Sequence, residues 1–349
     1  MSQQVPPAKS RIEWIDVARG LGIILVVYGH VLRGLILAGL IPATNPIWLS
    51  DYTIYTFHMP LFFVLAGLNV EHSLMKGHNS FIIVKLWTIA YPYFLWSLVQ
   101  GSLQLLIPEY LNSPRSAWSL VAILWHPIAQ FWFLYALFAR HLIAWACFGR
   151  RTVLTLLAIT LLIVRHYNSS SRWDVLAFAF PFYVAGILIS SPALQLRLSL
   201  TKSLLATGIF SVCFAVSVHY GRILSGGVLS SQASLPAAVF GILLTMAASY
   251  SIVSISHKLA NWLRFLGAAS LTIYILHVLA ASGTRIALKH VHLLVWQEQL
   301  ILGTLAGILI PLCAHIFLDR MKLLSTLGLA SQSTVARKTR GVHVTELGS

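Results

Sequence analysis

Charged residues are scarce in this 349-residue chain, and that scarcity excludes most classes of soluble protein. Only 9% of the residues are Asp, Glu, Lys or Arg, whereas a typical globular domain has about 25%. A solvated surface cannot be built from so few charges. Hydrophobic residues make up 58% of the chain, and the mean hydropathy is +0.80. We therefore expect one integral membrane domain, and exclude disordered, fibrous and disulfide-scaffold proteins.

Acidic residues and cysteines are also few. Nine Asp and Glu residues stand against 24 Lys and Arg, which gives a formal net charge of +15. In a membrane protein this basic excess sets topology and meets anionic lipid headgroups, so we expect membrane lipids and no nucleic acid as partners.

The cysteines Cys147, Cys213 and Cys313 lack metal or redox spacing. No zinc motif, phosphate-binding glycine loop or nucleophile elbow occurs, so no metal is expected.

Apolar stretches of about 20 residues recur along the whole chain and predict membrane-spanning helices. Open sheet edges are not tolerated in lipid, and the alternating pattern of a membrane barrel is absent, so we predict an all-α polytopic membrane protein. Ten spans are predicted, at about 16–38, 52–70, 81–107, 125–147, 152–166, 174–191, 203–220, 233–255, 266–288 and 296–319.

The basic residues between these spans predict the orientation of the chain. If the N-terminus is inside, most of the 24 Lys and Arg residues fall in cytoplasmic connections. An even number of spans then places the C-terminus inside as well. The predicted division is a cytoplasmic N-terminal segment (1–15), a transmembrane domain (16–322) and a disordered cytoplasmic tail (323–349).

The first predicted span carries three polar side chains, Asp16, Arg19 and His30, in or at the edge of hydrocarbon. Such groups are costly there and are usually functional. Arg19 and His30 share one helix face, because eleven residues make three turns plus about 20°, and they lie about 16 Å apart along the axis. The structural alternative is an Arg19 topology anchor paired with Asp16 and a hydrogen-bonded His30. Their alignment favours an intramembrane cavity that both residues line.

Further polar residues enter later spans. His58 is predicted to lie at the depth of His30 on a neighbouring antiparallel helix, with Pro60 freeing backbone carbonyls beside it. Two histidines at one depth indicate a general base with an orienting or oxyanion-stabilising partner. Lys85 is interpreted as a snorkelling anchor, with contact to an anionic ligand as the alternative. His277, near the middle of a later span, is interpreted as a structural histidine bonded to a neighbouring helix.

Several segments resemble the membrane-bound acyltransferase-3 family. They are WID-x-x-RG at 14–20 followed by Gly-His at 29–30, FHMPLFFVLAG at 57–67, YPYFLWS at 91–97 and FWFLYALF at 131–138. These segments are similar to the fucose-acetylase-like branch of the family, which modifies bacterial surface and signalling glycans. The architectural similarity covers essentially the whole chain.

The resemblance implies an O-acetyltransferase of the bacterial inner membrane. It would move an acetyl group from acetyl-CoA to a hydroxyl of a glycan or lipid-linked sugar. The Arg and His of the family motif fall on Arg19 and His30, and the histidine before Met-Pro falls on His58, which makes these three the catalytic candidates. Direct transfer and an acyl-histidine intermediate both stay open.

Three residues near the cytoplasmic ends of the first and third predicted spans are candidates for the donor site. Arg19, Lys85 and Asp16 are the candidates for binding acetyl-CoA, since cations near the cytoplasmic surface can meet its phosphates. Many family members carry a second basic residue three positions after the first, and this chain has Thr88 there.

The alternative function is a lipid-linked glycan flippase or exporter. Proton-driven transport is disfavoured because acids are nearly absent from the spans.

Overall fold

The computed structural model describes residues 12–42, 44–106, 116–167, 174–227, 233–292, 295–332, 334 and 335, and these residues form no β-strand. The helices are α1 Glu13–Leu37, α2 Trp48–Gly67, α3 Val70–Met75, α4 His78–Lys85, α5 Tyr91–Leu106, α6 Trp118–Ala122, α7 Trp132–Ala146, α8 Arg151–Tyr167, α9 Asp174–Leu188, α10 Ser190–Gln195, α11 Leu200–Leu224, α12 Leu235–Ile255, α13 His257–Ala268, α14 Ser270–His290 and α15 Trp296–Arg320. A π-helix, Leu86–Ala90, joins α4 to α5, and a 3₁₀ turn, Ala129–Phe131, precedes α7. The all-α prediction is confirmed for the described residues.

Seven helical segments are long and apolar enough to cross a membrane. They are Glu13–Leu37, Trp48–Met75, His78–Leu106, Leu200–Leu224, Leu235–Ile255, Ser270–His290 and Trp296–Arg320, and each coincides with a predicted span. The other three predicted spans contain α7, α8 and α9, of 15, 17 and 15 residues. At about 1.5 Å per residue, these helices are shorter than a hydrocarbon core of about 30 Å. Ten membrane crossings therefore stay a prediction.

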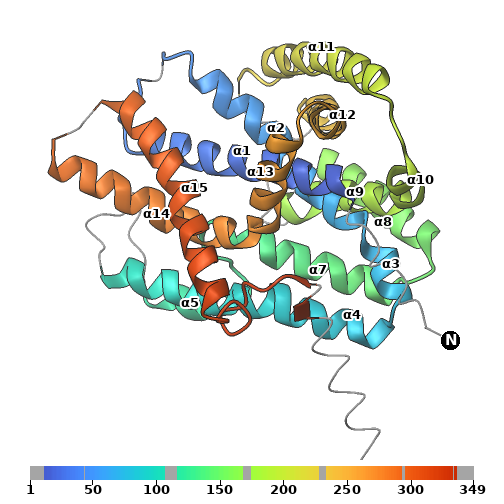
Figure 1. Cartoon of the computed structure of the whole chain (residues 1–349), viewed down its shortest axis with the longest axis horizontal. Coiled ribbons are helices and arrows are strands. Elements are labelled where there is room, and N and C mark those ends of the chain that lie inside the picture. Colours follow the sequence, from blue (N-terminus) through green and yellow to red (C-terminus); the bar gives the residue numbers. More distant parts are fainter. Residues whose placement is uncertain are drawn as a thin grey trace, which may run out of the picture.

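Helix α1 lies at the centre of the bundle, where it contacts α2, α12, α13, α14 and α15 (Figure 1). Its apolar side chains are buried on several sides: Val17, Ala18 and Val26 are fully buried. The polar residues of the first predicted span thus lie on the helix that the rest of the fold surrounds.

Helix α13, which was not predicted, packs closely along the N-terminal half of α1. Its buried residues include Ala260, Leu263 and Gly267, which repeat at helical spacing and form one apolar face. A side chain at Gly267 would overlap the backbone carbonyl of Asp16, and one at Gly20 would overlap that of Leu263. Glycine at both positions lets the two backbones touch, as small residues do between membrane helices.

The chain folds back over α5 after α15 ends (Figure 1). Trp96 of α5 donates its indole N–H to the carbonyl of Leu327 at 3.0 Å, and Leu329 is only 3% exposed. Within the tail that was expected to be disordered, Gly328, Leu329 and Ala330 are therefore buried, and this part of the segment packs on α5. Residues 336–349 and 1–11 of the expected terminal segments lie outside the described residues.

Candidate active site

A small cavity of about 140 Å³ lies between the helices that carry the two predicted catalytic histidines. Its lining comes from α1, α2, the 3₁₀ turn before α7, the start of α7, α9 and α14, and consists of His30, Tyr55, His58, Met59, Pro60, Gln130, Trp132, Ala179 and Tyr274. His30 and His58, which were predicted to lie at one depth on neighbouring helices, therefore face a common space. Pro60 also lines the cavity, directly beside the α2 turn that holds His58.

Both histidines are held in one tautomer by the backbone of their own helix. Nδ1 of His30 lies 2.9 Å from the carbonyl oxygen of Val26, and Nδ1 of His58 lies 2.7 Å from that of Ile54. A carbonyl oxygen can only accept, so in each neutral ring Nδ1 carries the proton and Nε2 carries the lone pair. The site thus offers two imidazoles whose basic atom is Nε2.

A third imidazole, that of His277 on α14, packs against His30. The two ring centroids are 5.0 Å apart and the rings meet at 73°, edge to face. Nδ1 of His277 donates to the carbonyls of Tyr274 and Ile273, at 2.7 and 3.1 Å. The interpretation of His277 as bonded to a neighbouring helix is wrong, because the bonds of Nδ1 stay within α14. Its contact with His30 was not predicted.

Two tyrosines belong to the site and were missed from the sequence. Tyr55 packs edge to face on His58, with 4.7 Å between ring centroids, and Tyr274 lies 6.1 Å from His277. Each tyrosine precedes its histidine by three residues, and that spacing puts both side chains on one helix face. The repeated Tyr-x-x-His pattern on two helices was the available signal.

Gln130 shows no such signal, because its place depends on a turn and on two distant helices. The hydroxyl of Tyr274 donates to the backbone carbonyl of Gln130. The side chain of Gln130 exchanges hydrogen bonds with Gln100 of α5, at 2.8 and 3.2 Å. These bonds fix a polar wall on the cavity at a residue that is only 3% exposed.

An ion pair also packs against Tyr55. Arg33 of α1 makes a two-pronged contact with Asp51 of α2, with Nε–Oδ1 at 3.2 Å and Nη2–Oδ2 at 2.7 Å. The Arg33 guanidinium lies 3.2 Å from the centroid of the Tyr55 ring. A bidentate pair stacked on an aromatic face orients that ring more firmly than packing alone does.

The other predicted residues form a separate group at the opposite end of α1. Arg19 contacts the Asp16 carboxylate at 3.4 Å, as predicted. Lys85, where α4 meets the π-helix, lies near enough to Arg19 for their charges to repel. Its ammonium is buried, at 5% exposure, and donates to the side-chain oxygen of Gln332 at 2.8 Å. A snorkelling anchor would reach solvent, so that interpretation of Lys85 is wrong.

The structure therefore brings the predicted residues together as two groups. His30 and His58 share the cavity, while Arg19, Asp16 and Lys85 gather three helical turns away. Arg19 does not line the cavity, contrary to the expectation of one space that both Arg19 and His30 face. Within the described part of the chain, no group of three or more His, Cys, Asp or Glu residues has a geometry that could hold a metal ion.

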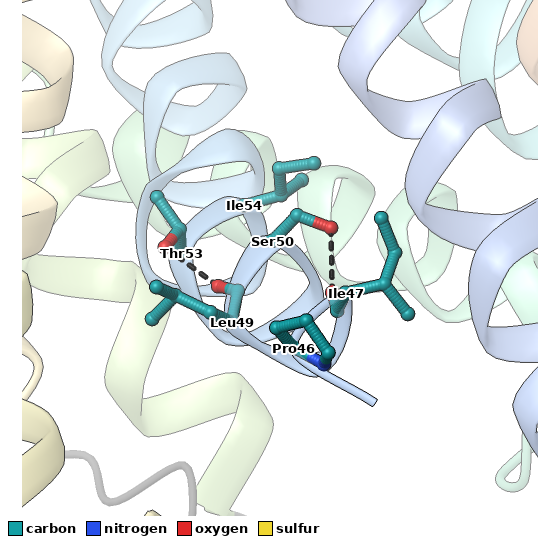
Figure 2. A pocket seen from close by; sticks show the side chains of 6 residues that line it. All are labelled: Pro46, Ile47, Leu49, Ser50, Thr53 and Ile54. Atoms are coloured by element: carbon teal, nitrogen blue, oxygen red, sulfur yellow. Dashed lines mark hydrogen bonds between the residues drawn. The ribbon is translucent and has the colours of Figure 1, made fainter. Parts of the chain in front are cut away.

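A wider hollow of about 530 Å³ lies at the start of α2, but it offers no acid–base group. Figure 2 shows its lining, which consists of Pro46, Ile47, Leu49, Ser50, Thr53 and Ile54. The hydroxyls of Ser50 and Thr53 donate to the carbonyls of Ile47 and Leu49, both at 2.7 Å (Figure 2). Because the polar groups of the lining are satisfied within α2, the histidine cavity is the candidate active site.

Comparison with known proteins yields one family and two relatives. A family model described as an acyltransferase domain matches residues 12–318. The nodulation protein NolL of Mesorhizobium japonicum is 28% identical over 182 residues, and that of Sinorhizobium fredii is 27% identical over 244 residues. The alignments cover 51% and 62% of this chain, but 47% and 59% of the relatives. No solved structure matches the chain.

Proposed function

Because the chain belongs to the acyltransferase family whose domain covers residues 12–318, we propose that it is an integral membrane O-acyltransferase. The proposed reaction moves an acetyl group from acetyl-CoA to a hydroxyl of a glycan or lipid-linked sugar. One observation carries the proposal: His30 lines a cavity between apolar helices with Nδ1 fixed and Nε2 left basic. The name of the relatives refers to nodulation and does not specify a substrate.

His30 is the general base of the proposed reaction. Its Nε2 takes the proton of the acceptor hydroxyl as that oxygen attacks the thioester carbonyl. The new oxygen–carbon bond forms, the carbon–sulfur bond breaks, and His30 returns the proton to the departing thiolate. His58, whose buried Nε2 has no hydrogen-bond partner among the described residues, faces the same cavity and orients the acceptor hydroxyl or the reacting carbonyl.

The second group of residues suits the donor. Arg19 and Lys85 place two cations close together, and Asp16 fixes the guanidinium of Arg19. Guanidinium and ammonium groups bind phosphate oxygens, so this group would hold the phosphates of acetyl-CoA. A distance of about 16 Å along α1 separates Arg19 from His30. The long pantetheine arm of the donor can span that distance, with its thioester toward His30.

The tyrosine and tryptophan of the cavity suit a sugar acceptor. Tyr55 and Trp132 line the cavity with aromatic rings, and Gln130 and Tyr274 add polar groups fixed by their own hydrogen bonds. Apolar walls with a few convergent polar groups are the usual form of a small-molecule site. A single sugar ring reaching into the cavity from a larger glycan would place one hydroxyl near His30.

The proposed setting is the bacterial inner membrane. The N-terminal segment 1–15 and the tail 323–349 would be cytoplasmic, and residues 16–322 would form the membrane domain with ten crossings. The donor group at Arg19 then faces the cytoplasm, where acetyl-CoA is found, and the histidine cavity lies toward the outer surface. This orientation follows from the basic residues between the spans.

Mass spectrometry of glycans tests the function. Cells lacking the gene are complemented with wild-type protein, His30→Ala or His257→Ala, the last being an exposed histidine on α13 that serves as a control. Wild type and His257→Ala should add one acetyl mass to a surface or lipid-linked glycan. His30→Ala should lower the transfer rate by about 10²- to 10⁴-fold at equal protein level, the usual contribution of a general base.

Two outcomes would contradict the proposal. Full acetylation with His30→Ala would remove the catalytic assignment. An unchanged acetyl content in the null strain, with a glycan accumulating on one leaflet, would indicate a flippase or exporter.

A further inference from the structure

His277 is a buried titratable group that the proposed reaction does not use. It is fully buried on α14, does not line the cavity, and packs edge to face against the ring of His30 at 5.0 Å. Its Nδ1–H is bound to the carbonyls of Tyr274 and Ile273, while its buried Nε2 has no hydrogen-bond partner among the described residues. A buried nitrogen without a partner is costly and calls for an explanation.

The ring of His277 has two electron-rich parts that are not used within its own helix. Its single ring N–H is used within α14, so the π face and the Nε2 lone pair remain. Electron-rich groups of this kind attract a cation more strongly than a neutral neighbour, as in cation–π contacts. His30, which is neutral before reaction and charged after it accepts a proton, is the neighbour in question.

The Asp51 carboxylate, which acts on His30, is already paired with a cation. The charged groups that act on His30 are Arg33 and Asp51, and both oxygens of Asp51 are bound by the Arg33 guanidinium. The titratable neighbours on α2 are Tyr55, whose ring is 6.2 Å from His30, and His58. His277 on α14 is the ring in closest packing with His30.

We propose that His277 is a positioning residue that holds the His30 ring and stabilises it in the protonated state through its Nε2 lone pair and π face. This inference rests on the proposed function of His30. The proton taken from the acceptor hydroxyl stays on His30 until the thiolate leaves, and His277 does not exchange it. His277 therefore raises the rate of the chemical step and leaves substrate binding unchanged.

Three substitutions at this position separate the two ring nitrogens. In His277→Gln, the side-chain amide reaches the place of Nε2 and can present an oxygen there. In His277→Asn, the amide reaches only the place of Nδ1 and can keep the bond to the α14 backbone. His277→Leu keeps neither. His315→Leu removes a histidine of α15 that bonds to Thr272 of α14 at 2.7 Å, and it serves as the matched control.

Steady-state acetyl transfer by purified full-length protein in lipid nanodiscs gives the test, with the thermal midpoint recorded for each variant. We expect His277→Leu and His277→Asn to lower kcat about tenfold with both KM values within about twofold, the size of a desolvated cation–π contact. His277→Gln should regain most of the lost kcat. His315→Leu should retain the wild-type kcat.

The failure of this inference is distinguishable from the failure of the proposed function. If wild type transfers acetyl and His30→Ala does not, the function stands. In that case a wild-type kcat in His277→Leu would overturn the role of His277. A purely structural role is the conclusion if His277→Asn is active and His277→Gln is not, or if kcat falls only in step with the thermal midpoint.

Discussion

The two ends of α1 carry opposite kinds of polar chemistry. At the end with His30, which we term the imidazole end, His30, His58 and His277 gather around a cavity, and the nearby charges of Arg33 and Asp51 neutralise each other. At the other end, termed the cationic end, Arg19 contacts the Asp16 carboxylate, and Lys85 lies near enough to Arg19 for their charges to repel. A neutral acid–base site and a pair of cations thus lie near the two ends of one helix, three turns apart.

The difference shows how a membrane helix can divide a two-substrate reaction. Groups that exchange protons need a dry, uncharged setting, whereas groups that hold phosphates must keep their charge. Substitutions at the imidazole end should therefore change kcat, and those at the cationic end should change the KM for the donor. The predictions below, from the largest effect to the smallest, can sharpen or break this division.

The largest effect is expected from Arg19→Gln at the cationic end. Loss of a charged donor to phosphate should raise the KM for acetyl-CoA by about 10- to 100-fold, with little change in kcat. Arg264→Gln is the matched control, because Arg264 is a half-exposed cation on α13 that pairs with Glu13 at 2.6 Å near the same end of α1. A fall in kcat at an unchanged KM would mean that Arg19 acts in the chemical step. The two ends of α1 would then not differ in the way proposed.

A smaller effect is expected from Asp51→Asn at the imidazole end. The substitution removes the charge that holds Arg33, and so loosens the guanidinium on the Tyr55 ring. We expect kcat/KM for the acceptor to fall about tenfold, the cost of a lost charged hydrogen bond, with no change in the KM for acetyl-CoA. Glu298→Gln, the same change at an exposed position of α15, should have no effect on either. A change confined to the donor would show that Asp51 acts elsewhere.

The smallest effect, and the only gain, is expected from Gln332→Ala. The side-chain oxygen of Gln332 accepts the hydrogen bond of Lys85 and so occupies an ammonium that the donor would use. Its removal should lower the KM for acetyl-CoA by roughly two- to tenfold, the range of one hydrogen bond. Thr326→Ala is the control in the same segment, because Thr326 holds Tyr91 through its backbone carbonyl. A higher KM in Gln332→Ala would mean that the contact orders Lys85 for the donor.

Much of the architecture could be predicted from residue order. Hydropathy located seven segments that are long enough to cross a membrane, because burial in lipid requires about 20 apolar residues in a row. Helical periodicity correctly paired Asp16 with Arg19. The helix α13 escaped prediction because it is short and amphipathic, and only its packing on Gly20 shows its place.

The candidate site was predicted in part. Depth within the bilayer correctly placed His58 and His30 at one cavity, because depth follows from residue count along antiparallel helices. The contact of His277 with His30 depends on the rotation and neighbours of α14, which hydropathy does not encode. The same holds for Gln130, which reaches the cavity from a 3₁₀ turn.

The amino-acid sequence by itself determined that this protein is a helical membrane protein, and it named the polar residues that enter the apolar helices. Those properties depend on the local cost of placing each residue in lipid, which is additive along a chain. The tertiary structure alone decided that the histidines and the cations form two groups, and that Lys85 is covered by Gln332. Contacts between distant segments depend on how whole helices pack, and no local property of either segment contains that information.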